Sequence, residues 1–365
     1  MYAKRLILKN FRTYPSLEVT FPDHSVFLTG QNGSGKTNII EAIYYLTLGR
    51  SFRKADDQEL IRNGERQASI YLDYYDEKDG KDHTISCLIQ KKMKMFAVDG
   101  EEVQKLSSIL GKFLSVYYEP SQVFFFKEEP SVRRRLLDET ISQFSNEYLY
   151  AIGRYKKLLK ERNAALSQNG DTDIIRAYRD QLINLSYRIV YERKKAVRAL
   201  NKKTSDLYRE LFREDKTMTM VYKTNCPLDD DQKSFVKNSI RQFEDNKSIE
   251  ALRKTTLIGP HRDDLTGLLD QNPIAAYGSQ GENRIASLAL RLAIASKMKE
   301  TLGHAPILLL DDVTSDLDSS RTAKLISITK NLGQTFITGT NVPKGMEDYA
   351  IYETSDDKTQ LIRRK

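Results

Sequence analysis

Short apolar runs separated by turn residues dominate the first 120 positions of the chain, and this pattern is typical of β-strands. It predicts strands at Arg5–Lys9, Leu17–Phe21 and Ser25–Thr29. Apolar residues then recur at helical spacing, which predicts a helix over Thr37–Leu48. Further strands are predicted at residues 68–75, 83–90 and 113–118.

Residues 132–214 have the pattern of long helices. This stretch contains no proline, and its only glycines are Gly153 and Gly170. A polar turn at Ser167–Asp173 separates two helices, and the second runs to about Phe212. We therefore predict an antiparallel helical hairpin whose second helix is roughly 60 Å long. The apolar stripe of the first helix consists of Leu137, Ile141, Phe144, Tyr148, Ile152, Tyr155 and Leu159.

Alternating strand and helix patterns return after residue 250. Glu282–Lys299 is predicted to be a helix, and Phe336–Thr338 a strand. Pro306–Leu310 is continuously apolar, as strands buried in a parallel sheet are. The chain therefore predicts an α/β head with a mixed sheet and flanking helices, interrupted by an inserted helical domain. We place the head at residues 1–130 and 250–365 and the helical insertion at residues 131–249.

The charge of the chain is concentrated in the helical stretch. The whole sequence has 58 basic and 50 acidic residues, a formal charge of +8. Residues 132–214 hold 19 basic and 11 acidic residues, whereas the remainder holds 39 of each. The excess could belong to a solvated helix face, or it could be the electrostatic footprint of a nucleic-acid-binding surface.

Composition excludes several classes of protein. The only cysteines, Cys87 and Cys226, are far apart and lack metal-site spacing, so neither a disulfide nor a zinc site is expected. No apolar run approaches the 18 residues of a membrane span, and the N-terminal residues lack the apolar core of a secretory signal. We expect a cytoplasmic protein with no membrane partner.

A phosphate-binding loop follows the strand that is predicted to end at Thr29. The residues Gly30, Gln31, Asn32, Gly33, Ser34, Gly35, Lys36 and Thr37 match the pattern G-x-x-x-x-G-K-[ST]. The glycines let successive backbone N–H groups turn toward an anion, and the following helix adds its positive end. Lys36 is expected to reach the β- and γ-phosphates of ATP, and the Thr37 hydroxyl to bind Mg²⁺.

Two adjacent carboxylates follow the predicted strand Pro306–Leu310. This strand delivers Asp311 to the magnesium ion and Asp312 to the attacking water, which a carboxylate can orient. Lys36 and Asp312 are thus the predicted catalytic residues. The alternative is that the two aspartates only cap the next turn, an interpretation that the phosphate loop upstream disfavours.

The predicted helix at Glu282–Lys299 begins within a glycine-containing motif. Ser279 and Glu282 fit the S-x-x-E capping box, in which each side chain satisfies a backbone N–H at the helix start. Gly278 and Gly281 would leave this end bare, so that a phosphate can approach it.

The order of these motifs resembles the ABC-type P-loop ATPase heads of the SMC/Rad50 class, and within it the RecF family of bacterial recombination-repair proteins. The insertion of roughly 120 residues is short for Rad50 or SMC proteins, and Rad50's CxxC hook is absent. The stretches that carry the resemblance are KNFRTY, GQNGSGKTNIIEAIYYL, GRSFR, PSVRRRLLD, GPHRDDL, YGSQGENR and LLLDDVTSDLD.

The resemblance implies a mechanism in which two subunits sandwich ATP. The signature motif of one subunit, Ser279, Gln280, Gly281 and Glu282, would contact the γ-phosphate that Lys36 of the other subunit holds. ATP and Mg²⁺ would thereby close a homodimer on DNA in a largely sequence-independent manner, and weak, DNA-stimulated ATP hydrolysis would open it. The family also implies cooperation with the RecO and RecR mediator proteins.

Further site positions follow from the resemblance. Ser315, Asp316 and Asp318 lie in the loop that would cross the dimer interface. Gln122 is the candidate for the glutamine that helps to bind magnesium, and Thr338 or Thr340 takes the place of the switch histidine. Arg12 and Arg53 resemble nucleotide- or DNA-sensing arginines, with surface ion pairs as the equal alternative. For His261 a structural hydrogen-bonding role is favoured over catalysis.

Two rival functions remain at this stage. One is the nucleotide-binding subunit of another ABC-type ATPase, such as a transporter or a different SMC-like protein. The long basic insertion and the missing switch histidine argue against a transporter. The other is a monomeric P-loop phosphotransferase, in which the signature motif would have no role in turnover.

Overall fold

The chain folds into two units, each with its own set of contacts. The computed structural model describes residues 1–53, 55–168, 172–212, 215–315, 317–354 and 360–364. We call Met1–Val123, Thr204–Lys216 and Gln280–Lys365 the head unit, and Phe124–Lys203 and Thr217–Ser279 the insertion unit. These boundaries differ from those expected from the sequence. Residues 204–216 group with the head, and residues 124–130 and 250–279 with the insertion.

An antiparallel sheet forms one part of the head unit. Its strand order is β2-β1-β4-β5-β6-β7. Side chains along β4 alternate between buried and half-buried positions, because successive residues of a strand point to opposite faces. The strands are β1 (Tyr2–Phe11), β2 (Tyr14–Thr20), β4 (Gln67–Asp76), β5 (Lys81–Gln90), β6 (Met93–Val98) and β7 (Glu101–Val103).

A second, mostly parallel sheet carries the predicted phosphate loop. Its order is β15-β14-β3-β13-β12-β8, and only the β14–β15 pair is antiparallel. The predicted α/β fold is thus confirmed. Parallel strands end at the same edge of a sheet, so the carboxyl ends of β3, β12, β13 and β14 lie there. The strands are β3 (Val26–Thr29), β8 (Ser115–Tyr118), β12 (Ile307–Leu310), β13 (Thr335–Thr338), β14 (Ala350–Thr354) and β15 (Leu361–Arg363).

Helices complete the head unit. Nearly every residue of α1 (Lys36–Leu48) is buried, and α1 ends at Gly49, as the sequence predicts. Buried side chains run along α8 (Gln280–Leu302), which contacts β8. The short helix α9 (Ser319–Lys330) is capped by the side chain of Asp318. Single 3₁₀ turns of the chain lie at Asp57–Leu60, Leu106–Ser108, Pro120–Phe124 and Pro260–Arg262.

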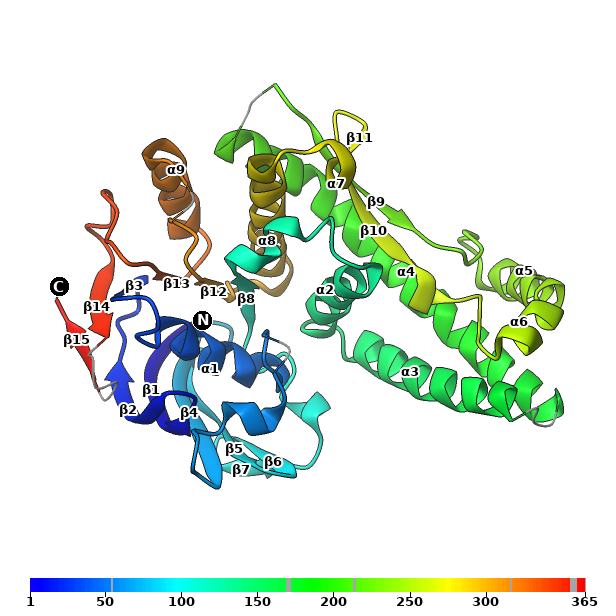
Figure 1. Ribbon diagram of the computed structural model, residues 1–365, viewed down its shortest axis with the longest axis horizontal. Helices are drawn as coiled ribbons and strands as arrows, with labels where there is room; N and C mark the ends of the chain where they lie inside the picture. The colour runs from blue at the N-terminus through cyan, green and yellow to red at the C-terminus, as the bar shows by residue number, and fades with distance from the viewer. Residues whose placement is uncertain (54, 169–171, 213–214, 316, 355–359, 365) are drawn as a thin grey trace. The chain divides into compact units, whose positions relative to one another are not determined.

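Three helices form the first part of the insertion unit: α2 (Pro130–Ser142), α3 (Asn146–Ser167) and α4 (Thr172–Leu211), whose last turns belong to the head. The two longer ones, α3 and α4, run antiparallel in Figure 1, as the predicted hairpin requires. The single stripe predicted through residues 137–159 is wrong in one respect. The helix breaks after Ser142, where Ser145 caps α3 by accepting the Tyr148 N–H, and Phe144 is left 39% exposed in the break.

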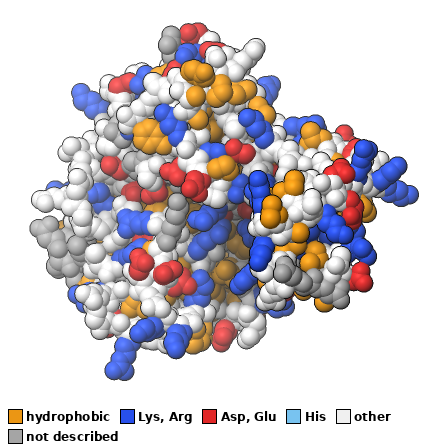
Figure 2. Space-filling model, turned by 45° about the vertical axis from the view of Figure 1, so that its right-hand side comes forward, with side chains coloured by type: hydrophobic (Ala, Val, Ile, Leu, Met, Phe, Trp, Pro, Cys, Tyr) orange, Lys and Arg blue, Asp and Glu red, His pale blue; other side chains and the backbone are white. Residues whose placement is uncertain are grey.

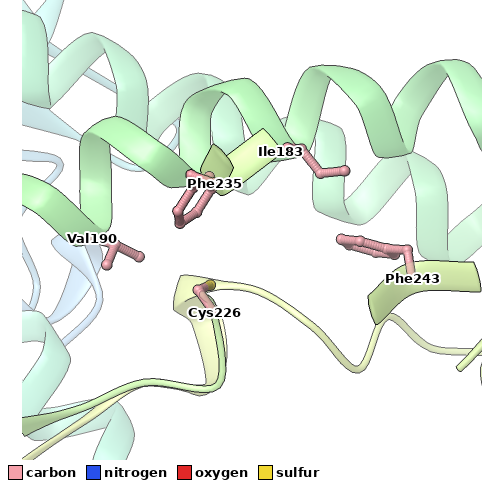
Figure 3. Close-up of a cluster of buried hydrophobic side chains, with 5 residues drawn as sticks. All are labelled: Ile183, Val190, Cys226, Phe235 and Phe243. Atoms are coloured by element: carbon pink, nitrogen blue, oxygen red, sulfur yellow. The ribbon is translucent and has the colours of Figure 1, made fainter. Parts of the chain in front are cut away.

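The second part of the insertion unit was not anticipated from the sequence. It contains a three-stranded antiparallel sheet of order β11-β10-β9 and two helices beyond it. Ile183 and Val190 of α4 form a buried cluster with Cys226, Phe235 and Phe243 (Figure 3). The elements are β9 (Met218–Lys223), α5 (Gln232–Asp245), α6 (Lys247–Arg253), β10 (Asp264–Leu269), β11 (Asn272–Pro273) and α7 (Ile274–Tyr277).

An ionic network lies at the centre of the insertion unit. The Arg193 guanidinium is 2% exposed and donates to Asp138 (2.8 Å), Asp263 (3.2 Å) and the carbonyl oxygen of Pro260 (2.8 Å). Tyr148 donates to Asp138 at 2.7 Å. Burial raises the pKa of Asp263, although Arg193 and hydrogen bonds lower it in part. The network ties α2, α3 and α4 to the GPHRDD segment.

Part of the basic charge of the insertion unit is therefore internal. Besides Arg193, the buried Arg133 pairs with Asp264 (2.7 Å) and the buried Arg162 with Glu250 (2.6 Å). On the face shown in Figure 2, basic side chains are interspersed with acidic and hydrophobic ones. The exposed basic side chains of α3 and the insertion part of α4 include Arg154, Lys156, Lys157, Lys160, Lys195, Arg198 and Lys202.

Two expectations about the chain as a whole can be compared with the described residues. Cys87 and Cys226 are both buried and free, so neither forms a disulfide. Within the described ranges, no helix combines the length and apolar character that crossing a bilayer requires.

Candidate functional site

The phosphate loop joins β3 to α1 in the conformation that its glycines permit. Gly30, Gly33 and Gly35 have φ angles of 142°, 80° and 104°, which other residues adopt only with strain. A Cβ on Gly35 would also lie 2.7 Å from the Tyr14 hydroxyl, whereas no atom of the described residues lies within 4 Å of one on Gly33. The loop is thus packed on one side and open on the other.

The Lys36 side chain folds back onto the phosphate loop and binds its backbone. Its ammonium donates to the carbonyl oxygens of Gly30 (2.6 Å) and Gln31 (2.7 Å). Burial lowers the pKa of Lys36, and the nearby carboxylates of Asp312 and Asp311 act in the opposite direction. The structure therefore places a partly buried cation, Lys36, near the two carboxylates that follow β12.

Asp311 follows β12 and faces the start of α1. Its Oδ1 accepts hydrogen bonds from the hydroxyls of Thr37 (3.0 Å) and Thr338 (2.6 Å). Burial raises the pKa of Asp311, although these two hydrogen bonds lower it in part. A buried carboxylate held against a threonine hydroxyl is a hard-oxygen donor set of the kind that Mg²⁺ prefers.

Asp312 has an unusual backbone conformation. Its φ of 46° lies in the left-handed region, which aspartate tolerates better than most residues. Its N–H donates to Thr338 Oγ1 at 2.8 Å, and its carbonyl oxygen accepts from Ser315 Oγ at 2.9 Å. Of the two threonines proposed for the switch position, Thr338 lines the cavity, whereas the Thr340 carbonyl oxygen accepts a hydrogen bond from the Thr29 hydroxyl. The switch role stays a prediction.

One cavity of about 310 Å³ collects these groups. The phosphate loop forms one side, and Asp311, Asp312 and Thr338 form another. Thr13, Asn38 and Arg53 also line it; sequence reasoning had not assigned the first two. Asn38 could have been suspected, because it directly follows Thr37. The lining is Thr13, Asn32, Gly33, Gly35, Lys36, Thr37, Asn38, Arg53, Asp311, Asp312 and Thr338.

The two arginines of interest have different surroundings. Arg12 binds the fully buried Glu41 through two hydrogen bonds, of 2.9 and 2.7 Å, so it is an ion-pair partner inside the head. Arg53 also lies 3.6 Å from the Glu41 carboxylate, but it lines the cavity and donates to Asn38 Oδ1 at 3.1 Å. Of the pair, only Arg53 is therefore placed to reach a ligand of the cavity.

Gln122 and the signature motif do not line the cavity. The Oε1 atom of Gln122 accepts two hydrogen bonds from Arg291, at 2.8 and 3.1 Å. In the signature motif, Ser279 and Gln280 are exposed where α8 begins, and Gly281 is half-buried. The Glu282 carboxylate accepts the ammonium of Lys216 at 2.6 Å. The roles of these residues stay predictions.

Other predicted positions have local roles. Asp318 caps α9 and pairs with Arg321 at 3.1 Å, while Asp316 lies outside the described residues. His261 accepts from the Tyr155 hydroxyl at 2.6 Å, and its other ring nitrogen lies 3.1 Å from the Thr256 carbonyl oxygen. Burial lowers the pKa of His261 to about 4, so the ring is neutral near pH 7. Its surroundings are those of a structural histidine.

The fold and the cavity together define a class. A phosphate loop between β3 and α1, two aspartates after the parallel strand β12, which β13 separates from β3, and a helical insertion make the head an ABC-type P-loop ATPase head of the SMC class. The RecF/RecN/SMC N-terminal domain family matches residues 2–356. The chain belongs to the RecF family of DNA replication and repair proteins.

Individual relatives are similar over nearly the whole chain. The DNA replication and repair protein RecF of Halalkalibacterium halodurans is 35% identical over 364 residues, 97% of each chain. That of Clostridium tetani is 34% identical over 98% of this chain and 97% of its own. A solved structure of the recombination mediator protein RecF with ATP has a TM-score of 0.91 and 27% identity, covering 100% of this chain and 98% of its own. An SMC head bound to the winged-helix domain of ScpA shares the fold alone, at a TM-score of 0.60 and 17% identity.

Proposed function

We propose that this chain is an ATP-dependent DNA-binding protein of recombinational DNA repair and replication restart. ATP would drive its dimerisation on duplex or gapped DNA, and slow hydrolysis would release it. The observation that carries the proposal is the single cavity in which the phosphate loop faces Asp311 and Asp312. The relative solved with ATP, described as a mediator of the RecFOR pathway, supports it.

ATP would bind with its phosphates on the loop. The open side of Gly33 and the bare start of α1 present backbone N–H groups to an anion. The Lys36 ammonium adds a charge-assisted hydrogen bond, which is about twice as strong as a neutral one. Asn38 and Arg53 can contact the remaining polar groups of the nucleotide.

The residues present fit a magnesium ion. The Thr37 hydroxyl and the Asp311 carboxylate would hold it, since their oxygen atoms already lie 3.0 Å apart. Among the described residues that line the cavity, the only other cations near Asp311 are Lys36 and Arg53. When bound, the ion neutralises the phosphate charge that builds up during hydrolysis. Thr338 keeps Asp311 in place through its hydrogen bond.

Asp312 would act on the attacking water. A carboxylate beside the γ-phosphate can orient that water and accept a proton from it. The Thr338 and Ser315 hydroxyls bind the Asp312 backbone on both sides and fix where its side chain starts. Because aspartate is shorter than the glutamate found in transporter-type ATPases, we infer slow turnover, as a switch requires.

The signature motif would complete the site of a second copy of the chain. Ser279 and Gln280 are exposed, and the nearest described atom to a Cβ on Gly281 would belong to the Phe212 ring, at 3.9 Å. This leaves room for a phosphate held by a partner. Two such contacts related by a twofold axis would give an isologous homodimer.

DNA and mediator proteins are the proposed partners. The exposed lysines and arginines of α3 and α4 supply the positive charge for phosphate contacts, which would be largely independent of sequence. RecO and RecR are proposed because the relative solved with ATP is assigned to the RecFOR pathway.

ATP turnover measured with and without duplex DNA tests the proposal. DNA should stimulate turnover, and the stimulation should fall steeply between about 50 and 200 mM salt. Over this range, proteins with several phosphate contacts lose about 10³-fold of their affinity for DNA. Light scattering should show a dimer only with ATP. A lack of stimulation by any DNA, in a protein that hydrolyses ATP, would favour the rival ATPase functions.

Replacing Ser279 with arginine tests the role of the signature motif. The arginine would fill the space for the partner's γ-phosphate without touching the phosphate loop of its own subunit. We expect the Kd for ATP to stay within about twofold, ATP-dependent dimerisation to be lost and turnover to fall about 100-fold, the typical cost of losing a phosphate-stabilising contact. Calorimetry, light scattering and phosphate release measure the three quantities.

Ser107→Arg is the matched control, since it places the same side chain on an exposed serine of the head far from the motif in sequence. It should dimerise and turn over ATP like the native chain. Native turnover in Ser279→Arg would instead support a monomeric phosphotransferase.

A further inference from the structure

Thr354, the last residue of β14, lies beside the phosphate loop. Because β14 runs parallel to β3, with Glu353 paired to Thr29, the ends of both strands reach the same edge of the sheet. Thr354 is buried, with 6% of its surface exposed. No sequence pattern had singled it out, since it lies about 320 positions after the loop that it contacts.

The Thr354 hydroxyl contacts the loop at two places. It donates to Ser34 Oγ at 2.6 Å, and it lies 3.3 Å from the carbonyl oxygen of Thr29. It also sits where a Cβ of Gly30 would be, so a side chain at Gly30 would collide with it. One hydroxyl thus touches the start of the loop and its fifth residue.

These contacts restrain the phosphate loop in the conformation that a bound phosphate requires. A glycine-rich loop has many accessible conformations, and holding it in one of them costs conformational entropy. The carbonyl groups of Gly30 and Gln31 already bind Lys36 from inside the loop. Thr354 holds the same segment from outside, and through Ser34 it restrains the part of the loop that leads into α1.

We propose that Thr354 is a positioning residue for nucleotide binding, which holds the phosphate loop in its binding conformation through Ser34. It does not line the cavity and acts only through the loop. This inference rests on the proposed function, because it concerns the site at which ATP would bind.

The test compares Thr354→Val with Thr354→Ser. Valine keeps the shape and removes the hydroxyl, and the Kd and KM for ATP should rise about five- to tenfold, the factor that corresponds to one hydrogen bond of about 1–1.4 kcal/mol. Turnover at saturating ATP should stay within about twofold, because bound phosphates restore the loop. Serine keeps the hydroxyl, so Thr354→Ser should bind ATP within about twofold of the native chain.

Ser34→Ala completes a double-mutant cycle. It removes the other partner of the hydrogen bond and should weaken ATP binding by a similar factor, while the double variant should be no weaker than either single one. Equal melting temperatures of all variants show that the head is intact.

Different failures have different meanings. Native ATP affinity in Thr354→Val, equal defects in the valine and serine variants, or additive effects of Thr354→Val and Ser34→Ala would each overturn the role of Thr354 and leave the proposed function standing. Absence of ATP binding by the native chain, measured first by calorimetry, would overturn the proposed function and this inference with it.

Discussion

Replacing Lys36 with alanine is expected to raise the Kd for ATP about 100-fold and to abolish measurable turnover. Lys36 is the cation that faces Asp311 and Asp312 across the cavity. Its removal deletes charge-assisted hydrogen bonds to the phosphates, which contribute about 1.5–3 kcal/mol each, where about 2.7 kcal/mol corresponds to 100-fold. The substitution also leaves the carboxylates of Asp311 and Asp312 to repel the anionic ligand without the opposing charge of Lys36. Calorimetry measures the Kd, and phosphate release measures turnover.

Asp312→Asn is the matched control within the same cavity. It removes a negative charge, so ATP should bind at least as tightly as in the native chain. Turnover should nevertheless fall about 100-fold, within the range that general acid–base groups contribute. The two variants thus separate binding from hydrolysis. Unchanged ATP affinity in Lys36→Ala would mean that the phosphate loop is not the site, and unchanged turnover in Asp312→Asn would remove that residue from the mechanism.

Replacing Arg193 with methionine should destabilise the insertion unit by about 3–5 kcal/mol, the typical cost of breaking a buried ion pair by removing one partner. Asp138 and Asp263 are at most 9% exposed, and both would lose the guanidinium. Burial raises the pKa of Asp138, but Arg193 and Lys156 together hold it below its ordinary value in the native chain. Urea unfolding followed by the helical circular dichroism signal measures the loss.

The pH dependence of the loss tests its electrostatic origin. Without Arg193, burial alone would raise the pKa of both carboxyl groups, so the folded variant would bind protons more readily than the unfolded chain. Its stability relative to the native chain should therefore recover as the pH falls toward 4. A deficit that does not change with pH would point to lost packing. Arg188→Met makes the same change at the solvent-exposed ion pair between Arg188 of α4 and Glu147 of α3, and it should leave the unfolding midpoint nearly unchanged.

Local sequence patterns were sufficient for the parts of the site that are continuous in the chain. The phosphate loop was predicted from Gly30 to Thr37, because its glycines, lysine and threonine each have a physical role at fixed spacing. Asp311 was predicted because an apolar strand ends just before it. The structure brings these segments together, as the edge of a parallel sheet requires.

Contacts between segments that are distant in the sequence could not be predicted from these local patterns. Thr354 and Thr338 are ordinary threonines at strand ends, and only the sheet order β14-β3-β13-β12 places them around the loop and Asp311. Similarly, the charge excess of the helical insertion was assigned to a solvated helix face or a nucleic-acid-binding surface, because the sequence does not show that Arg133, Arg162 and Arg193 pair internally. The break before α3 was missed because Phe144 continues the spacing of the stripe although Ser145 caps a new helix.

The order of strands in the parallel sheet has a consequence for biosynthesis. Val26 of β3 pairs with both Phe336 and Ala350, so the strand that leads into the phosphate loop lacks both neighbours until β13 and β14 have left the ribosome. At about 5–20 residues per second, this interval is roughly 15–65 s. The antiparallel sheet, by contrast, uses only residues 2–103 and can form early. A nascent chain therefore carries an incomplete nucleotide site until residues 335–354 have been made, and it gains the ability to bind ATP only after that point.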